Sequence, residues 1–140
     1  MDRGMVYISK KVFFSSAHRM FNPELSDEEN MRIYGKCANP GGHGHNYVLQ
    51  VTLRGTPDEK TGLVMGLDKL KNLLDKEIIT RFDHKDLSND VEVLRGSVAS
   101  MENLVEVIWD ILEPKIFGAE LHEVKLWETE NNCACYRGGV

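Results

Sequence analysis

Residues 42–54 read Gly-His-Gly-His-Asn-Tyr-Val-Leu-Gln-Val-Thr-Leu-Arg, so two histidines lead directly into an alternating stretch of sequence. From Tyr47 to Leu53 every odd position is apolar, whereas the even positions are largely polar. Because successive residues of a β-strand point to opposite faces, this pattern predicts a strand with one buried face. His43 and His45 lie on that face, about 7 Å apart along the backbone.

Residues 6–14 predict an earlier strand. Its apolar face continues to His18 and is interrupted only by Lys10; the other positions on it are Val6, Ile8, Val12, Phe14 and Ser16. Antiparallel pairing of the two strands over one core would bring three imidazoles to one end of the sheet. Three imidazoles with an open fourth position are typical of a catalytic zinc site, whereas structural zinc sites are closed by four protein ligands. A solvated His-Gly-His loop is the simpler alternative.

Two amphipathic helices are predicted between the strand pairs. The first begins at Leu67, and the second begins after Ser100, a suitable N-cap, and ends by Pro114. Their apolar stripes are Leu67, Leu70, Leu73, Leu74 and Ile78 in the first, and Met101, Leu104, Val105, Ile108 and Leu112 in the second. A shorter helical segment over residues 25–34 has capping-box spacing between Ser26 and Glu29.

Two further strands, over residues 122–128 and 133–137, are separated by the turn-prone pair Asn131-Asn132. The resulting order is strand, strand, helix, helix, strand, strand. It predicts an α+β fold in which an antiparallel sheet carries its helices on one face.

The composition fits one domain over residues 1–140, since 41% of the residues are hydrophobic. The 17 basic and 22 acidic side chains include no basic block, which argues against a nucleic-acid partner. We expect no membrane segment, because no apolar run approaches the roughly 20 residues that a span requires. The N-terminus lacks an apolar signal core, and the three cysteines are an odd number, so we expect free thiols in the cytoplasm.

Cys37 lies six residues before His43, in a loop rich in glycine and proline. Lys36 and a nearby zinc ion would both favour its thiolate, the form that acts as a base or a nucleophile. Two alternatives are a fourth zinc ligand and an inert packed thiol.

Several other polar residues are candidates for the chemistry. Asp83 and His84 can orient one another or relay a proton, or simply make local contacts after a helix. Glu128 follows Val124 and Leu126 on an apolar strand face, where a buried carboxylate needs a partner such as the two N–H groups of an aminopyrimidinone. Exposure at a sheet edge, or pairing with a lysine, is the alternative.

Taken together, these residues resemble those of the 6-pyruvoyltetrahydropterin synthase family, in its eukaryotic form. The matching blocks run in order through nearly the whole chain: FSSAHR at 14–19, LSDEEN at 25–30, YGKC at 34–37, HGHNY at 43–47, DHK at 83–85, EN at 102–103 and WET at 127–129.

The resemblance implies a lyase that converts 7,8-dihydroneopterin triphosphate to 6-pyruvoyl-tetrahydropterin with loss of triphosphate, a step of tetrahydrobiopterin biosynthesis. By this resemblance, His18, His43 and His45 bind one Zn²⁺ per subunit. Cys37 transfers protons, and Asp83 and His84 form its relay. Glu128 binds the pterin ring with help from Glu102. Glu102 taken alone is an ordinary acidic residue in the first turn of a helix.

The family's tunnelling fold is a four-stranded antiparallel sheet with two helices on one face. Trimers close these sheets into a barrel, and two trimers stack as a homohexamer. The resemblance therefore implies active sites between subunits, with Asp83 and His84 reaching Cys37 of a neighbour.

Two departures and two competing functions accompany the resemblance. Met101 replaces the usual threonine of animal members and Asp86 the common asparagine, while Cys133 and Cys135 are also unusual and are expected to pack.

The first competitor is 6-carboxytetrahydropterin synthase of queuosine biosynthesis, although the longer interval between Cys37 and His43 disfavours it. The second is a module that binds pterin or zinc without turnover.

Overall fold

A single twisted sheet organises the chain in the computed structural model, which describes residues 4–139. The four main strands are β1 (Val6–His18), β2 (His43–Gly55), β4 (Glu120–Thr129) and β5 (Asn132–Tyr136), and their pairings are antiparallel as predicted. The sheet nevertheless has five strands, in the order β3-β1-β2-β4-β5. The expected number of four is therefore one too few.

The additional strand β3 comprises only Lys85–Asp86 and runs parallel to the end of β1. Two backbone hydrogen bonds hold this segment against β1: His84 N donates to Ser15 O at 2.6 Å, and Leu87 N donates to Ala17 O at 2.8 Å. A two-residue strand is too short to produce an alternating pattern, which explains why the sequence did not reveal it.

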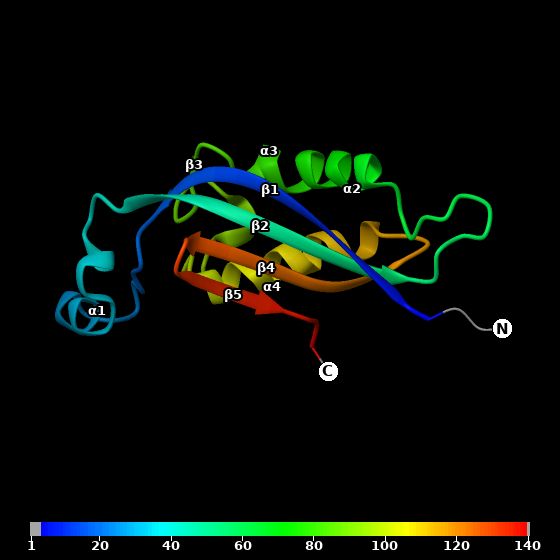
Figure 1. Ribbon diagram of the computed structural model, residues 1–140. Coiled ribbons are helices and arrows are strands. Elements are labelled where there is room, and N and C mark those ends of the chain that lie inside the picture. The colour runs from blue at the N-terminus through cyan, green and yellow to red at the C-terminus, as the bar shows by residue number, and fades with distance from the viewer. Residues whose placement is uncertain (1–3, 140) are drawn as a thin grey trace.

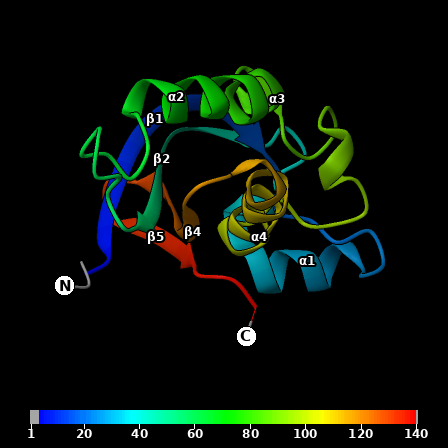
Figure 2. The ribbon, with the colours of Figure 1, turned by 90° about the vertical axis from the view of Figure 1, so that its right-hand side faces the viewer.

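The helical layer covers one face of the sheet, as the turned view shows (Figure 2). Helix α2 (Leu67–Leu74) continues through a π-helical segment, η2 (Asp75–Ile79), into α3 (Thr80–Phe82), and these elements lie against β1. Helix α4 (Met101–Leu112) lies against β4 and β5. Both predicted amphipathic helices are confirmed.

Other short elements lie around this framework. Helix α1 (Asp27–Tyr34) and the 3₁₀ turn η1 (Gly35–Ala38) connect β1 to β2 and lie beyond the end of the sheet (Figure 1). The 3₁₀ turns η3 (Glu92–Leu94) and η4 (Glu113–Lys115) flank α4. The predicted cap at Ser26 is present, since Glu29 N donates to Ser26 Oγ, which is one of the two hydrogen bonds of a capping box.

The core lies between the sheet and the helical layer. Its fully buried residues include Leu49, Val51, Leu53, Leu70, Leu74, Ile78, Leu104, Ile108, Leu112, Val124 and Leu126. Leu67, by contrast, is exposed at the start of α2. Each buried leucine or isoleucine contributes on the order of 2 kcal/mol, so this layer fixes which face of β2 and β4 is turned toward the helices. Within residues 4–139, no helix is long and apolar enough to cross a membrane.

Candidate functional site

Strand register brings three histidines together at one end of the sheet. His18 on β1 is directly opposite His43 on β2, and Ser16 is opposite His45. The ring centroids are 4.5 Å apart for His18 and His43, 5.0 Å for His18 and His45, and 4.7 Å for His43 and His45. One ring nitrogen from each residue lies within 4.8 Å of the others. The geometry that alternation predicted is therefore present.

A backbone carbonyl fixes the orientation of His18, which is only 1% exposed. Its Nδ1 lies 2.7 Å from Ala99 O, at the residue before the N-cap of α4. Because a carbonyl only accepts, Nδ1 donates and Nε2 keeps its lone pair. That Nε2 lies 2.9 Å from His43 Nε2, so the free nitrogen points into the cluster. Such a second contact typically holds a metal-ligating histidine in place.

The environment keeps the other two imidazoles neutral. Burial, and then the neighbouring His18, lower the pKa of His43. Burial also lowers the pKa of His45, although the Glu128 carboxylate opposes this effect. Metal ions bind the neutral form of imidazole, so these shifts favour a ligand set.

One unsatisfied atom supports a bound ion. His45 Nε2 is buried and has no hydrogen-bond partner. Glu128 Oε1 approaches it to 3.4 Å without the geometry of a hydrogen bond. A buried polar atom without a partner destabilises a fold by about 1–3 kcal/mol, and coordination to an ion would satisfy it. The three residues therefore fit a metal site.

Glu128 lies at an irregularity of β4, where the pairing with β5 shifts between Trp127 and Thr129. Its Oε2 is 4.0 Å from His18 Nε2, so the carboxylate faces the cluster from the neighbouring strand. Glu128 and His45 also line the same cavity, of about 650 Å³. The predicted position of a carboxylate on the apolar face is confirmed.

Tyr47 forms the floor below the cluster. Its side chain is fully buried, stacks on Phe14 and places its hydroxyl 3.5 Å from His18 Nδ1. Burial raises the pKa of Tyr47, with a further contribution from Glu128, so the phenol stays protonated.

Cys37 lies close to the cluster along the chain but not in contact with it. Its carbonyl accepts a hydrogen bond from Met20 N at 2.8 Å, which ties η1 to the chain just beyond β1. Within residues 4–139 no hydrogen bond joins its half-buried thiol to the histidines. The loop then passes over His18 at Gly42, where φ is +67° and an added Cβ would lie 2.8 Å from His18 O.

Asp83 and His84 form the pair that the sequence suggested. Asp83 Oδ2 lies 2.9 Å from His84 Nδ1, and Asp83 Oδ1 accepts from Ser15 N at 2.9 Å. The Ser15 N–H, followed by His84, lowers the pKa of Asp83. His84 adopts a φ of 57°, and its side chain is 83% exposed. The carboxylate is thus anchored to β1 while the imidazole projects outward.

Glu102 also lies apart from the histidine cluster. It is exposed on the first turn of α4, and none of its described contacts reaches Glu128 or the histidines. Asp86, one of the two departures, caps a turn by accepting from Ser88 N and from the side chain of Asn89.

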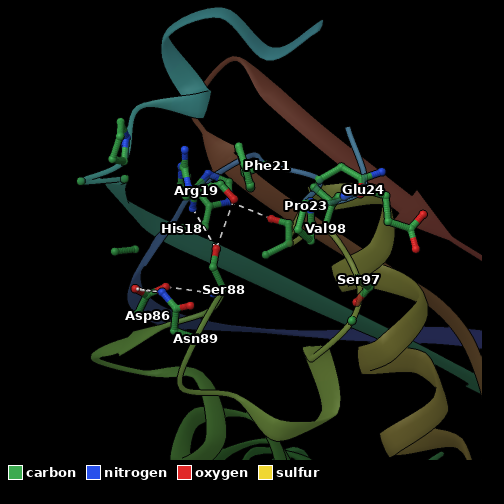
Figure 3. A pocket seen from close by; sticks show the side chains of 17 residues that line it. His18, Arg19, Phe21, Pro23, Glu24, Asp86, Ser88, Asn89, Ser97 and Val98 are labelled. Atoms are coloured by element: carbon green, nitrogen blue, oxygen red, sulfur yellow. Dashed lines mark hydrogen bonds between the residues drawn. The ribbon is translucent and has the colours of Figure 1, made fainter. Parts of the chain in front are cut away.

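A second cavity, of about 560 Å³, borders His18 and is lined by Arg19, Ser88 and Asp86 (Figure 3). Ser88 Oγ accepts from Arg19 N, joining the loop after β3 to the end of β1. Neither this cavity nor the role of the Ala99 carbonyl could be predicted from the sequence. A backbone acceptor has no side-chain signature, and the cavity forms from segments far apart in the chain.

Comparison with known proteins shows one family. The family model described as "6-pyruvoyl tetrahydropterin synthase" matches residues 7–139. The 6-pyruvoyl tetrahydrobiopterin synthase of Dictyostelium discoideum is 47% identical over 95% of this chain and 96% of its own. The structure of Caenorhabditis elegans 6-pyruvoyl tetrahydropterin synthase superposes with a TM-score of 0.93 at 37% identity, covering 99% of this chain and all of that one. A 6-carboxy-5,6,7,8-tetrahydropterin synthase from Rickettsia typhi is 26% identical over 91% of this chain and 96% of its own.

Proposed function

The chain belongs to the 6-pyruvoyl tetrahydropterin synthase family, and on that premise we propose that it converts 7,8-dihydroneopterin triphosphate to 6-pyruvoyl-tetrahydropterin and triphosphate. One observation carries the proposal: three imidazoles and the Glu128 carboxylate converge at one end of the sheet, beside a cavity of about 650 Å³. The whole chain would act as one domain, in the cytoplasm, where its three free cysteines stay reduced.

His18, His43 and His45 would hold one Zn²⁺ ion through their ring nitrogens. An ion bound there supplies Lewis-acid polarisation to oxygen substituents of the substrate. Glu128 would accept two N–H donors from the aminopyrimidinone edge of the pterin, and this pairing compensates the cost of desolvating the carboxylate. Glu102 would assist at the ring from the start of α4.

Cys37 would move protons between the side-chain carbons and the pterin ring. A thiolate is the form that accepts a proton, and His84 would restore it, with Asp83 fixing the tautomer and direction of the imidazole. The Asp83–His84 contact of 2.9 Å supports this relay.

The parts of this relay do not contact each other within one chain, and we attribute this separation to assembly. His84 projects away from its own subunit. Among the described residues, β5 ends the sheet with an open edge, and β3 covers the outer edge of β1 only at Ser16 and Ala17. Several large apolar side chains of the N-terminal segment are also exposed: Met5, Val6, Tyr7 and Phe13. Trimers that pair β5 with β1 of a neighbour would close these edges into a barrel, and two trimers would form the hexamer.

Incubation of the zinc-loaded protein with 7,8-dihydroneopterin triphosphate tests the proposal. We expect mass spectrometry to detect the 6-pyruvoyl product and a phosphate assay to detect released triphosphate. A 6-carboxy product with acetaldehyde would assign the chain to the competing activity. Bound zinc and pterin without turnover would instead indicate a binding module, and Cys37→Ala provides the corresponding inactive reference.

A further inference from the structure

Two lysines converge on one tryptophan at the edge of the proposed active site. The ammonium of Lys11 on β1 lies 4.9 Å from the ring centroid of Trp127, and that of Lys125 on β4 lies 4.8 Å from it. Trp127 and Lys11 line the same cavity as Glu128 and His45. Contacts of this kind hold a cation in place and leave its N–H donors free.

Strand register explains why both lysines reach the same tryptophan. Lys11 and Lys125 are both opposite Gln50 of β2, so the three residues form a row across the sheet on the face without helices. Trp127 is opposite Val48, two residues nearer to His45 along β2. Both ammoniums therefore meet at the ring of a residue whose own row lies nearer to the histidines, and Lys11 shares a cavity with His45.

Neither ammonium is neutralised within the described part of the chain. Other basic residues on the strands pair with acids, as Arg54 does with Glu120 and Arg137 with Glu123, both at 2.8 Å. No ion pair between a carboxylate and either Lys11 or Lys125 occurs among residues 4–139. Two unpaired cations held together beside a cavity form an electrostatic site for a multiply charged anion.

We infer that Lys11 and Lys125, positioned by Trp127, bind the triphosphate group of the substrate. This inference rests on the proposed function, because it extends the same cavity from the pterin position at Glu128 to a phosphate subsite. The polyphosphate would lie along the face of the sheet without helices, and the reacting side-chain carbons of the substrate would lie between the pterin position and the phosphate position. Phosphate oxygens would accept from the ammonium groups, whose charge would also favour triphosphate as the leaving group.

The Arg19 cavity is a poorer place for polyphosphate. Arg19 already donates its Nε–H to Ala38 O and stacks over Phe21 at 3.8 Å. The carboxylates of Glu24 and Asp86 line the same cavity and would repel an anion. The Lys11 cavity also includes an acid outside the proposed pterin contact, Glu130, but that residue is exposed in the β4–β5 turn, where solvent screens its charge.

Calorimetric titration with inorganic triphosphate tests the inference on the full chain. Triphosphate chelates zinc, so the titration is made on metal-free protein and repeated on zinc-loaded protein. We expect Lys11→Met and Lys125→Met each to raise the Kd for triphosphate about tenfold, and the double variant to raise it further. Lys10→Met is the matched control, because Lys10 lies on the same strand but on the opposite face, and its Kd should stay within about twofold of the original.

Turnover gives the second readout. The lysine variants should raise KM for 7,8-dihydroneopterin triphosphate and leave the binding of unphosphorylated 7,8-dihydroneopterin unchanged. Turnover with unchanged KM and Kd in the double variant would overturn the phosphate site and leave the proposed function intact. Triphosphate binding that depends on the lysines, in a protein that shows no turnover, would support the site and reject the function.

Discussion

At the scale of single residues, His45 differs from His122 in having a buried ring nitrogen that no group of the fold satisfies. His45 Nε2 is buried without a hydrogen bond, whereas His122 packs edge-on against Tyr7. We expect His45→Ala to abolish stoichiometric zinc binding, measured by plasma mass spectrometry after dialysis, and to retain the fold by circular dichroism. His122→Ala is the control and should keep one zinc per chain. Full zinc occupancy in His45→Ala would reject the three-histidine site.

The same residues make stability depend on pH in the metal-free protein. The pKa values of His43 and His45 are lowered in the folded state. At a pH below 6.5 these residues therefore bind more protons in the unfolded chain than in the folded protein. The contribution of these two histidines to folding stability should therefore decrease as the pH falls through 6.5 and reach its lower limit below their folded-state pKa values. Urea unfolding at a series of pH values measures this slope. Replacing both histidines with Asn should reduce it, whereas a slope unaffected by that double variant would exclude them as its source.

At the scale of elements, the loop that precedes β2 sets the position of His18. Gly42 has a positive φ, and a Cβ at this residue would lie 2.8 Å from the His18 carbonyl oxygen, while a Cβ at Gly41 would meet open space. We expect Gly42→Ala to lower the free energy of unfolding by about 1–2 kcal/mol and to weaken zinc binding. Gly41→Ala should change neither quantity appreciably. Equal effects of the two substitutions in denaturant titrations would show that the crossing over His18 is not the cause.

The π-helical segment η2 contains a second element-scale feature. Glu77 is buried there and pairs with Arg81 at 3.2 Å and with Lys115 of η4 at 3.5 Å. Both cations are about half exposed, so solvent weakens the pairs, and we expect Glu77→Ala to cost about 1–2 kcal/mol. Asp75→Ala, which removes an exposed pair with Lys71, should cost less than about 0.5 kcal/mol when measured by thermal and urea unfolding. A larger loss of unfolding free energy from Asp75→Ala than from Glu77→Ala would contradict this prediction.

Alternation and helical spacing predicted those features that depend on which face of a strand or helix a residue occupies. They indicated the β1–β2 pair, both amphipathic helices, the shared face of His18, His43 and His45, and the carboxylate position of Glu128. They did not indicate β3 or the Ala99 carbonyl, because both depend on backbone groups of distant segments, nor the π-helical hydrogen bonding of η2, because a local change in backbone bonding has no side-chain periodicity. The convergence of Lys11 and Lys125 on Trp127 was missed for a related reason, since the row that contains both lysines exists only once β1, β2 and β4 are in register.

At the scale of the whole molecule, the open edges and the outward His84 make a prediction about assembly. Helices cover one face of the sheet, so a barrel formed from several copies would keep them outside and turn the face without helices inward. Lys11, Lys125 and Trp127 would then line the interior, where a polyanion is shielded from bulk solvent. Native mass spectrometry should find three or six times the 15.9 kDa mass of the chain. A monomer at micromolar concentration would exclude shared active sites.

Mixing of inactive variants tests whether one site takes residues from two subunits. Cys37→Ala and His84→Ala should each be inactive alone, but a site between subunits can draw intact Cys37 from one chain and intact His84 from its neighbour. Refolding the two variants together at equal concentrations should restore about a quarter of the sites, the fraction expected for random assortment in a ring. Each site would take both Cys37 and His43 from one and the same subunit. A mixture of Cys37→Ala and His43→Ala should therefore stay inactive. Recovery in both mixtures, or in neither, would be inconsistent with a relay in which Asp83 and His84 reach the thiol of the adjacent chain.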